Sequence, residues 1–388
     1  MTDFGFGCMR LPLTDTSNPE SFDYPLIEKL FDTFLEHGFR YFDTAYVYHR
    51  THGEEAVRKA LVERHERSEF ELASKLPLRT FRHVSELEEI FDSQLERCGI
   101  EYFDYYLLHN MGVNVWPKAK DLGAVDLVLR KKTEGKIKKL GISFHDSPEL
   151  FDKILSELAD KIDFVQLQVN YADMEADGIR ARECLDVAAK YNLPVTVMEP
   201  VKGGTLANIP EDAEKLLQSA QPDTSPAAWA LRFAAQQKGV VRVLSGMNSM
   251  AQLEDNMKVF ENMMPLTEKD NSLLTKAAEI INSQTAIPCT GCEYCLQGCP
   301  KGILIPKIFT IYNSAARLTG GFSSEETYYT NLVLSSAYAS DCIKCGKCEQ
   351  ACPQHLKIRD LLENCVEKLE KNNPILAPFL TQKNTDDK

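Results

Sequence analysis

Short apolar runs alternate with longer amphipathic runs from the start of the chain to about residue 265. The short runs are rich in β-branched and aromatic residues, as strands are, whereas the longer runs repeat their apolar positions every three or four residues, as helices do. The expected strands are residues 4–9, 40–45, 70–75, 104–109, 138–143, 164–169, 195–200 and 241–246. The helix expected at 25–38 has an apolar stripe of Leu26, Leu30, Phe31 and Phe34.

Eight strands with helices between them predict a (β/α)8 TIM barrel. A doubly wound sheet is the alternative, but no G-x-G-x-x-G motif follows the first strand to open a helix. We therefore assign residues 1–265 to the barrel and residues 266–283 to a helix that links it to the rest. Residues 284–370 predict a small, mainly helical, cysteine-rich domain, and the polar residues 371–388 predict a flexible tail.

The composition is that of an ordinary globular protein, with 388 residues, 44% hydrophobic and 26% charged. A formal net charge of −13 argues against nucleic acid and anionic membranes as partners, because both select clustered Lys and Arg. The first residues carry no basic segment followed by an apolar one, and no run of about 18 apolar residues occurs. We therefore expect a cytoplasmic protein without a membrane partner.

The chain has twelve cysteines, and in a reducing compartment these serve more often as metal ligands or buried thiols than as disulfides. Four are scattered, and we expect them to be buried small apolar residues: Cys8, Cys98, Cys184 and Cys365. The other eight form two runs of the spacing C-x2-C-x2-C-x3-C-P, which holds 4Fe–4S clusters in electron carriers. These are Cys289, Cys292, Cys295 and Cys299, then Cys342, Cys345, Cys348 and Cys352.

Zinc is the alternative metal, but zinc sites more often join two C-x2-C hooks across a longer gap. The two cysteine runs also continue into similar apolar segments, so this region resembles a bacterial two-cluster ferredoxin. That resemblance implies that three cysteines of one run and the last cysteine of the other bind each 4Fe–4S cluster. The implied ligand sets are Cys289, Cys292, Cys295 and Cys352, and Cys342, Cys345, Cys348 and Cys299. About forty residues separate the runs, enough to cover a cluster or to contact the barrel.

Polar residues stand at the carboxyl ends of three expected strands, where barrel enzymes carry their chemistry. Asp43 closes one strand, Lys75 the next and His109 the one after, while Tyr48 follows Asp43 on a loop. Each alone could be a solvated loop residue or a satisfied polar group at the barrel rim. Because the four occur together, we interpret them as a candidate catalytic group.

The segments FDTAYVY, SK and LLH, preceded by GFGCMRLP and followed by LGIS and VQ, resemble the aldo-keto reductases over roughly the first 260 residues. The resemblance implies an oxidoreductase that acts on a carbonyl or conjugated carbonyl compound with a tetrad of Asp43, Tyr48, Lys75 and His109. A buried Lys75 cation would lower the pKa of Tyr48 and favour proton donation to a forming alkoxide. Asp43 would keep Lys75 charged, and His109 would orient the substrate carbonyl.

The same resemblance implies a nicotinamide site formed by Gly7, Cys8, Met9, Ser143, Gln166, Met198, Gly246, Gln252 and Asn256. Two positions depart from the family: Phe144 replaces the asparagine expected after Ser143, and Met198 replaces the aromatic residue on which nicotinamide stacks. Residues 245–257 contain no Lys or Arg to pair with a 2′-phosphate, unless the loop folds back onto Arg242. NADPH preference is therefore not supported, and NADH, a weakly held nicotinamide and a flavin stay open.

A barrel joined to a ferredoxin-like domain resembles the iron–sulfur aldo-keto reductases, and three functions stay open. In the first, the clusters exchange electrons with the barrel site or with an external ferredoxin-like partner, with a flavin between one-electron and two-electron chemistry. In the second, the clusters of an NAD(P)H-dependent reductase are structural; in the third, the protein senses redox state and is not an enzyme. The intact tetrad counts against the third, and eight placed cysteines favour the first. Residues 110–124 are expected to form a wall of the substrate pocket, with Trp116 either there or in the core.

Overall fold

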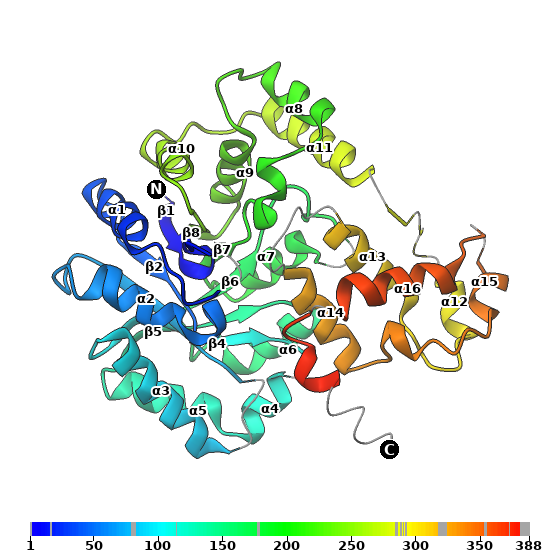
Figure 1. Ribbon diagram of the computed structural model, residues 1–388, viewed down its shortest axis with the longest axis horizontal. Coiled ribbons are helices and arrows are strands. Elements are labelled where there is room, and N and C mark those ends of the chain that lie inside the picture. Colours follow the sequence, from blue (N-terminus) through cyan, green and yellow to red (C-terminus); the bar gives the residue numbers. More distant parts are fainter. Residues whose placement is uncertain are drawn as a thin grey trace.

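The computed structural model confirms the (β/α)8 barrel (Figure 1). Eight parallel strands pair in chain order, and β8 pairs with β1 to close the barrel. The strands are β1 (Asp3–Gly7), β2 (Tyr41–Asp43), β3 (Glu71–Leu76), β4 (Phe103–Met111), β5 (Ile137–Phe144), β6 (Phe164–Gln168), β7 (Val195–Met198) and β8 (Val240–Ser245). The structure describes residues 2–15, 18–78, 83–113, 115–176, 179–283, 286–287, 289, 291, 293–316, 324–352, 355–371 and 373–380.

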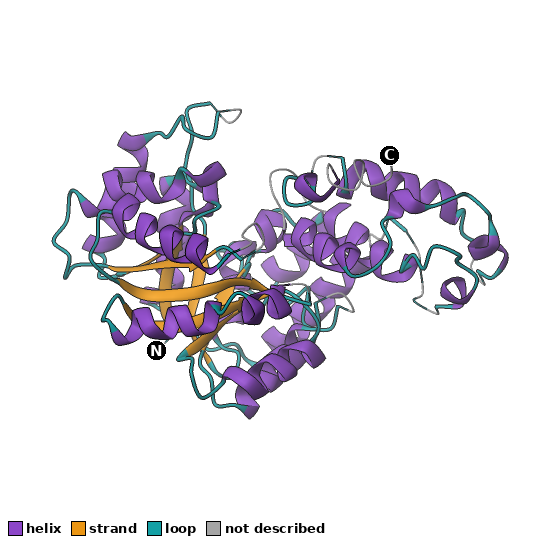
Figure 2. Cartoon of the chain, turned by 90° about the horizontal axis from the view of Figure 1, so that it is seen from below, coloured by secondary structure: helices purple, strands orange, loops and turns teal. Residues whose placement is uncertain are grey.

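Helices surround the sheet of the barrel, as Figure 2 shows. They are α1 (Tyr24–Glu36), α2 (Gly53–Val57), α3 (Val84–Cys98), α4 (Val115–Asp121), α5 (Ala124–Thr133), α6 (Pro148–Leu158), α7 (Ala181–Lys190), α8 (Glu211–Gln218), α9 (Pro226–Ala235), α10 (Met250–Glu261) and α11 (Glu268–Ser283). Short helical turns are η1 (Cys8–Arg10), η2 (Tyr48–Thr51), η3 (Arg58–Val62) and η4 (Lys202–Ala207). Within the described chain, no helix has the length and apolar character needed to span a bilayer.

Helix α1 shows how the local sequence sets these elements. The Asp23 carboxylate accepts a hydrogen bond from the backbone N–H of Leu26 at 3.2 Å and so caps the helix. Gly38 follows the last turn at φ +87°, a conformation that a glycine adopts without strain. The buried face consists of Ile27, Leu30, Phe31 and Phe34. Three of the four residues of the expected stripe are therefore buried, while Leu26 is only partly buried beside them.

The barrel interior is filled by large side chains that need close approach between strands. Tyr41, Leu107, Phe164 and Leu244 belong to one buried cluster there. A Cβ atom on Gly141 of β5 would lie 2.6 Å from the Phe164 ring, so glycine at this position makes room for that ring. The interior is thus a packed core.

The C-terminal region is mainly helical and lies beside the barrel (Figures 1 and 2). Its elements are α12 (Tyr294–Gln297), α13 (Ile305–Ala316), α14 (Ser324–Leu334), η5 (Ala339–Asp341), α15 (Lys347–Gln350) and α16 (Ile358–Leu369). Helix α11, at the position expected for a linker, packs along α8 through Leu217, Leu274 and Ala277. It therefore belongs to the outer layer of the barrel as well as leading away from it.

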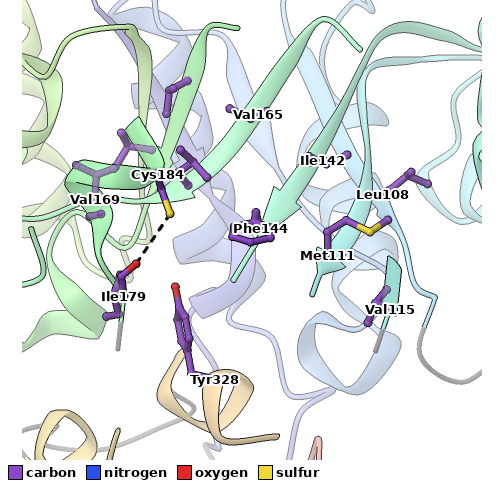
Figure 3. Close-up of a cluster of buried hydrophobic side chains, with 14 of the residues drawn as sticks. Leu108, Met111, Val115, Ile142, Phe144, Val165, Val169, Ile179, Cys184 and Tyr328 are labelled. Atoms are coloured by element: carbon purple, nitrogen blue, oxygen red, sulfur yellow. Dashed lines mark hydrogen bonds between the residues drawn. The ribbon is translucent and has the colours of Figure 1, made fainter. Parts of the chain in front are cut away.

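Helix α14 packs against the barrel at the carboxyl ends of β4, β5 and β6. The Tyr328 side chain points toward Phe144, Ile179 and Cys184 in a buried apolar cluster (Figure 3). Asn331 Nδ2 donates a hydrogen bond to the His145 carbonyl oxygen at 3.0 Å. The segment between the two cysteine runs thus contacts the barrel, which was one of its two expected roles.

Candidate functional site

A cavity of about 230 Å³ opens at the carboxyl ends of the barrel strands. Its walls include the last residues of four strands and a glutamine of a fifth: Gly7 of β1, Asp43 of β2, Gln166 of β6, Met198 of β7 and Ser245 of β8. Barrel closure brings these residues together from across some 240 positions of sequence. We call this space the strand-end cavity.

Lys75 lies behind the cavity in a fully enclosed polar cluster. Its Nζ donates hydrogen bonds to Asp43 Oδ1 at 2.6 Å, to the Thr44 carbonyl oxygen at 2.8 Å and to the Tyr48 hydroxyl oxygen at 3.2 Å. Lys75 is 1% exposed and Asp43 is 3% exposed. Burial by itself would lower the pKa of Lys75, but Asp43 and Tyr48 outweigh burial and hold this pKa above its usual value. Lys75 is therefore a cation at neutral pH.

The pKa of Tyr48 is raised above its usual value, although Lys75 lowers it in the expected direction. Burial of the phenolate is the largest cause, and the Asp43 charge adds to it. Lys75 acts in the opposite direction but does not outweigh burial. Tyr48 consequently stays protonated at neutral pH, which is the state that a proton donor needs.

His109 of β4 faces Tyr48 edge-on, with ring centroids 6.5 Å apart and an interplanar angle of 83°. It is half-buried. Tyr48 and Asp43 both line the strand-end cavity, whereas Lys75 supports them from behind. The four residues of the expected tetrad are thus gathered in one place, with a phenol facing the open space.

Seven of the nine expected cofactor positions line the strand-end cavity: Gly7, Met9, Gln166, Met198, Gly246, Gln252 and Asn256. Cys8 does not line the cavity, because its side chain is fully buried. Ser143 is 1% exposed, and its hydroxyl oxygen accepts a hydrogen bond from the Asn110 backbone N–H at 2.8 Å. That hydroxyl ties β4 to β5 rather than facing the cavity.

Gln166 offers an acceptor at the floor of the cavity. Its Nε2 donates a hydrogen bond to Asp43 Oδ2 at 3.2 Å. Its Oε1 is buried and has no hydrogen-bond partner within the described part of the chain. A buried carbonyl oxygen left in this state favours a ligand that brings an N–H donor, as the carboxamide of a nicotinamide does.

Phe144 points away from the cavity into the apolar cluster of Figure 3, where its ring stacks on Phe151 at 4.6 Å. The Phe144 substitution therefore removes a polar contact without placing a ring in the cavity. Arg242 lies at the opposite end of the barrel, where its Nε pairs with Asp3 Oδ2 at 2.8 Å and its guanidinium covers the Tyr41 ring. The idea that Arg242 could reach a cofactor phosphate is wrong, because this salt bridge holds it at the amino ends of the strands.

Sequence reasoning missed a cation that does line the cavity. Arg10 follows β1 in η1, and its Nη2 lies 3.5 Å from Glu199 Oε1, which also lines the cavity. The Arg10 side chain also approaches Gly246, where a Cβ atom would lie 3.8 Å from the Arg10 Cβ. The signal was present in GFGCMRLP, but nothing in a linear motif shows that Arg10 faces the loop after β8.

The second candidate site is a pocket in the cysteine-rich region. Its walls carry Cys299, Cys342, Cys345 and Cys348. This is one of the two ligand sets implied by the ferredoxin resemblance, with Cys299 contributed by the other run. Among the described residues no three His, Cys, Asp or Glu side chains are close enough for a single ion such as zinc. Four thiols around one pocket suit a 4Fe–4S cluster, in which each cysteine binds a different iron atom.

The other implied ligand set lies partly outside the described residues, because Cys292 is not among them. Cys295 is buried, and Cys289 and Cys352 are half-buried. The short helices α12 and α15, each of which lies within one of the two runs, pack against one another. The two halves of the cysteine-rich region therefore lie face to face, as an exchange of ligands between them requires.

The scattered cysteines Cys8, Cys98, Cys184 and Cys365 are all buried, which confirms their expected packing role. Trp116 of α4 is 3% exposed and packs in the hydrophobic core, with the Lys120 ammonium 4.9 Å from its ring centroid. Of its two expected roles, packing is the one observed.

Comparisons with known proteins identify the families of the barrel and of the cysteine-rich region. Residues 3–279 match the Aldo/keto reductase family, and residues 288–357 match a 4Fe-4S dicluster domain. The uncharacterized oxidoreductase YqkF of Bacillus subtilis is 25% identical over 301 residues, which are 70% of this chain and 90% of the relative. An aldo-keto reductase of Mycolicibacterium vanbaalenii is 27% identical over 234 residues, 58% of this chain and 75% of the relative.

Two solved structures illustrate the likeness of the barrel. The holo form of an aldo-keto reductase from Bacillus halodurans is 26% identical with a TM-score of 0.57, covering 71% of this chain and 91% of that chain. An aldo-keto reductase from Klebsiella pneumoniae, solved in complex with NADPH, is 20% identical with a TM-score of 0.53, covering 70% of this chain and 89% of that one. The second likeness shows the fold alone.

Proposed function

The chain belongs to the aldo/keto reductase family, and on that premise we propose that it interconverts a carbonyl or conjugated carbonyl compound and its reduced form, with electrons exchanged between the barrel and two 4Fe–4S clusters. One observation carries the catalytic part of the proposal. The buried Lys75 cation holds the Tyr48 hydroxyl at the wall of the strand-end cavity with Asp43 as its counter-ion. A carbonyl oxygen that reaches this hydroxyl would find a proton donor.

We propose a nicotinamide as the cofactor of the barrel, because Gln166 Oε1 is an acceptor suited to its carboxamide. Met198 would lie against the ring, and Gln252 and Asn256 would contact the adenosine part. When bound, the nicotinamide supplies a hydride. Arg10 offers a positive charge at the same cavity, so a phosphate of the cofactor has a partner there.

The side chains of the tetrad have separate tasks in this proposal. Tyr48 donates its hydroxyl proton to the oxygen of the substrate carbonyl as negative charge develops there. Lys75 stabilises the phenolate that remains, and Asp43 keeps Lys75 charged and in place. His109 is a second polar contact for the substrate oxygen and sets its direction.

For the clusters, Cys299, Cys342, Cys345 and Cys348 would hold one, and Cys289, Cys292, Cys295 and Cys352 the other. Such clusters pass single electrons. The contact of α14 with the barrel supports a route between the domains, with an external ferredoxin-like protein as a further electron partner. An NAD(P)H-dependent reductase with structural clusters is the second candidate, because the tetrad and cavity need no cluster for their chemistry.

An anaerobic titration distinguishes the two candidates. We expect NADH or NADPH to bleach the visible absorbance of the cluster-loaded protein without substrate. The bleaching should be complete at about one nucleotide per chain, because one hydride carries two electrons and each cluster accepts one. If dithionite bleaches the clusters but neither nucleotide does, electron exchange between nicotinamide and clusters is excluded. The reductase with structural clusters would then be the better account, and turnover should survive loss of iron.

The Lys75→Met variant tests the electrostatic part of the site. Lys75 is the group that lowers the pKa of Tyr48, so its removal should raise that pKa further. Reduction needs the protonated phenol, whose pKa is raised above the usual value of a tyrosine. The reduction rate of the wild type should therefore be level through neutral pH and fall only at strongly basic pH. In Lys75→Met we expect a lower rate throughout and a fall at higher pH still, seen in pH profiles of kcat. Lys120→Met, a surface change, should leave the profile in place, and an unmoved profile in Lys75→Met would contradict the assignment.

A further inference from the structure

A buried ionic cluster joins the barrel to the 4Fe–4S domain. Lys202 Nζ donates hydrogen bonds to Asp173 Oδ1 at 2.8 Å and to Glu325 Oε1 at 2.9 Å. Asp173 follows β6 and Lys202 follows β7, whereas Glu325 lies in the first turn of α14, between the two cysteine runs. The three side chains are 2–4% exposed. An ion pair in the barrel is thus completed by a carboxylate from the other domain.

Neutral donors add further hydrogen bonds to the two carboxylates of this cluster. Asp173 Oδ2 accepts hydrogen bonds from Gln168 Nε2 at 2.8 Å and from Asn170 Nδ2 at 2.7 Å. Glu325 Oε1 also accepts a hydrogen bond from the Ser314 hydroxyl of α13 at 2.7 Å. Buried charges are tolerated when they are paired and hydrogen-bonded in this way, and removal of one member leaves the others uncompensated. The cluster is therefore a defined connection and not a chance contact.

Lys202 stands within the segment that forms one wall of the strand-end cavity. The residues of this segment that line the cavity are Met198, Glu199, Pro200, Val201, Gly203 and Gly204. The Lys202 side chain instead points to the two carboxylates, while its backbone neighbours on both sides face the cavity. We call residues 198–204 the wall segment. Lys202 anchors this segment through its hydrogen bonds to Asp173 and Glu325.

The wall segment has a backbone that needs such a fastening. Glu199 and Lys202 have φ values of +54° and +49°, a left-handed conformation that costs energy for residues other than glycine. Asn170, a member of the cluster, also donates a hydrogen bond to the Glu199 carbonyl oxygen at 3.1 Å. The network therefore holds the wall segment at two points, and Glu325 is the part of it that belongs to the 4Fe–4S domain.

We infer that Glu325 is a positioning residue of the cofactor site: acting through Lys202, it holds the wall segment in the conformation that binds the nucleotide. The inference rests on the proposed function, because it takes the strand-end cavity to be the nucleotide site. Its consequence is that docking of the 4Fe–4S domain and nucleotide affinity are coupled, and coupling between two equilibria is reciprocal. The clusters would then support the barrel even in a turnover that draws no electrons from them.

The test compares variants of the full-length, cluster-loaded protein by titration with NADH and NADPH, followed by nucleotide fluorescence. We expect Glu325→Ala to weaken the binding of the preferred nucleotide about tenfold. Glu325→Gln keeps the shape and the hydrogen-bonding oxygen, so it should fold and bind with an intermediate affinity. At saturating nucleotide, kcat with nitrobenzaldehyde should stay near the wild-type value, because the tetrad is untouched. If the salt bridge were merely structural, the Glu325 variants would change in thermal stability but would not show a weaker nucleotide Kd at an unchanged kcat.

The matched control is Glu370→Gln. Glu370 is also buried in the C-terminal domain, but it accepts hydrogen bonds from the Tyr329 hydroxyl and the Ser340 backbone N–H, both of that domain. This variant should leave the nucleotide Kd within about twofold of wild type. The inference is overturned if Glu325→Gln and Glu325→Ala bind nucleotide as tightly as wild type with their clusters intact. If the wild type itself binds neither nucleotide, the proposed function fails first, which is a different result.

Discussion

Replacing Tyr48 with Phe should lower the rate of carbonyl reduction by about a hundredfold to ten-thousandfold, the usual contribution of a positioned proton donor. The ring and its contact with the Lys75 ammonium, 4.9 Å from the ring centroid, would remain. What disappears is the hydroxyl that accepts the Lys75 hydrogen bond at 3.2 Å and faces the cavity. We expect kcat with a reactive aldehyde such as nitrobenzaldehyde to collapse while the nucleotide Kd stays within about twofold.

Tyr46→Phe is the control for this experiment, because Tyr46 lies on the same loop but packs under the Arg97 guanidinium instead of facing Lys75. Its kcat should match that of the wild type. If Tyr48→Phe also retains full activity, the barrel does not reduce carbonyl compounds by the proposed route. A redox-sensing role without catalysis would then be the stronger interpretation.

Replacing Cys299 with Ala should remove one cluster and leave the other, so iron should fall from about eight to about four atoms per chain. The expected loss follows from the pocket that Cys299 shares with Cys342, Cys345 and Cys348, although Cys299 stands in the other run of the sequence. The double variant Cys299→Ala with Cys342→Ala should then keep the same four iron atoms, because both residues serve one cluster. Iron analysis and visible absorbance of anaerobically purified protein measure both results.

Cys365→Ala controls for general damage to the same domain, since Cys365 is fully buried on α16 and is not a cluster candidate. It should retain the full iron content. If the double variant loses all iron while each single variant loses half, each run binds its own cluster, and the exchanged ligand sets are wrong. In that outcome Cys299 would bind the cluster of its own run.

The two proposals meet at α14. This helix carries Glu325 at its start, Tyr328 in the apolar cluster of Figure 3 and Asn331, which donates a hydrogen bond to the His145 carbonyl oxygen. All three contacts lie at the carboxyl ends of barrel strands, where the chemistry is proposed. The segment between the cysteine runs therefore docks the 4Fe–4S domain onto the working end of the barrel.

Much of this molecule could be predicted from local patterns, because those patterns act over a few residues. Each of the eight expected strands has a counterpart, since alternating apolar runs and glycine or polar ends specify strands within the run itself. The cysteine spacing indicated the 4Fe–4S domain, and the strand-end positions of Asp43, Lys75 and His109 placed them at one rim once a barrel was assumed. In a barrel, strands that follow one another in the sequence are also neighbours in space, which is why those residues could be grouped in advance.

The tertiary structure decided what depends on burial and on contacts far apart in the chain. The pKa of Tyr48 rises because the fold desolvates its phenol more strongly than Lys75 compensates, a balance that no motif records. Arg242 proved to lie at the wrong end of the barrel, and Arg10 to lie at the cavity, because side-chain direction follows from packing. Lys202 and Glu325 are 123 residues apart in the sequence, and their pairing exists only because two separately patterned domains fold against each other.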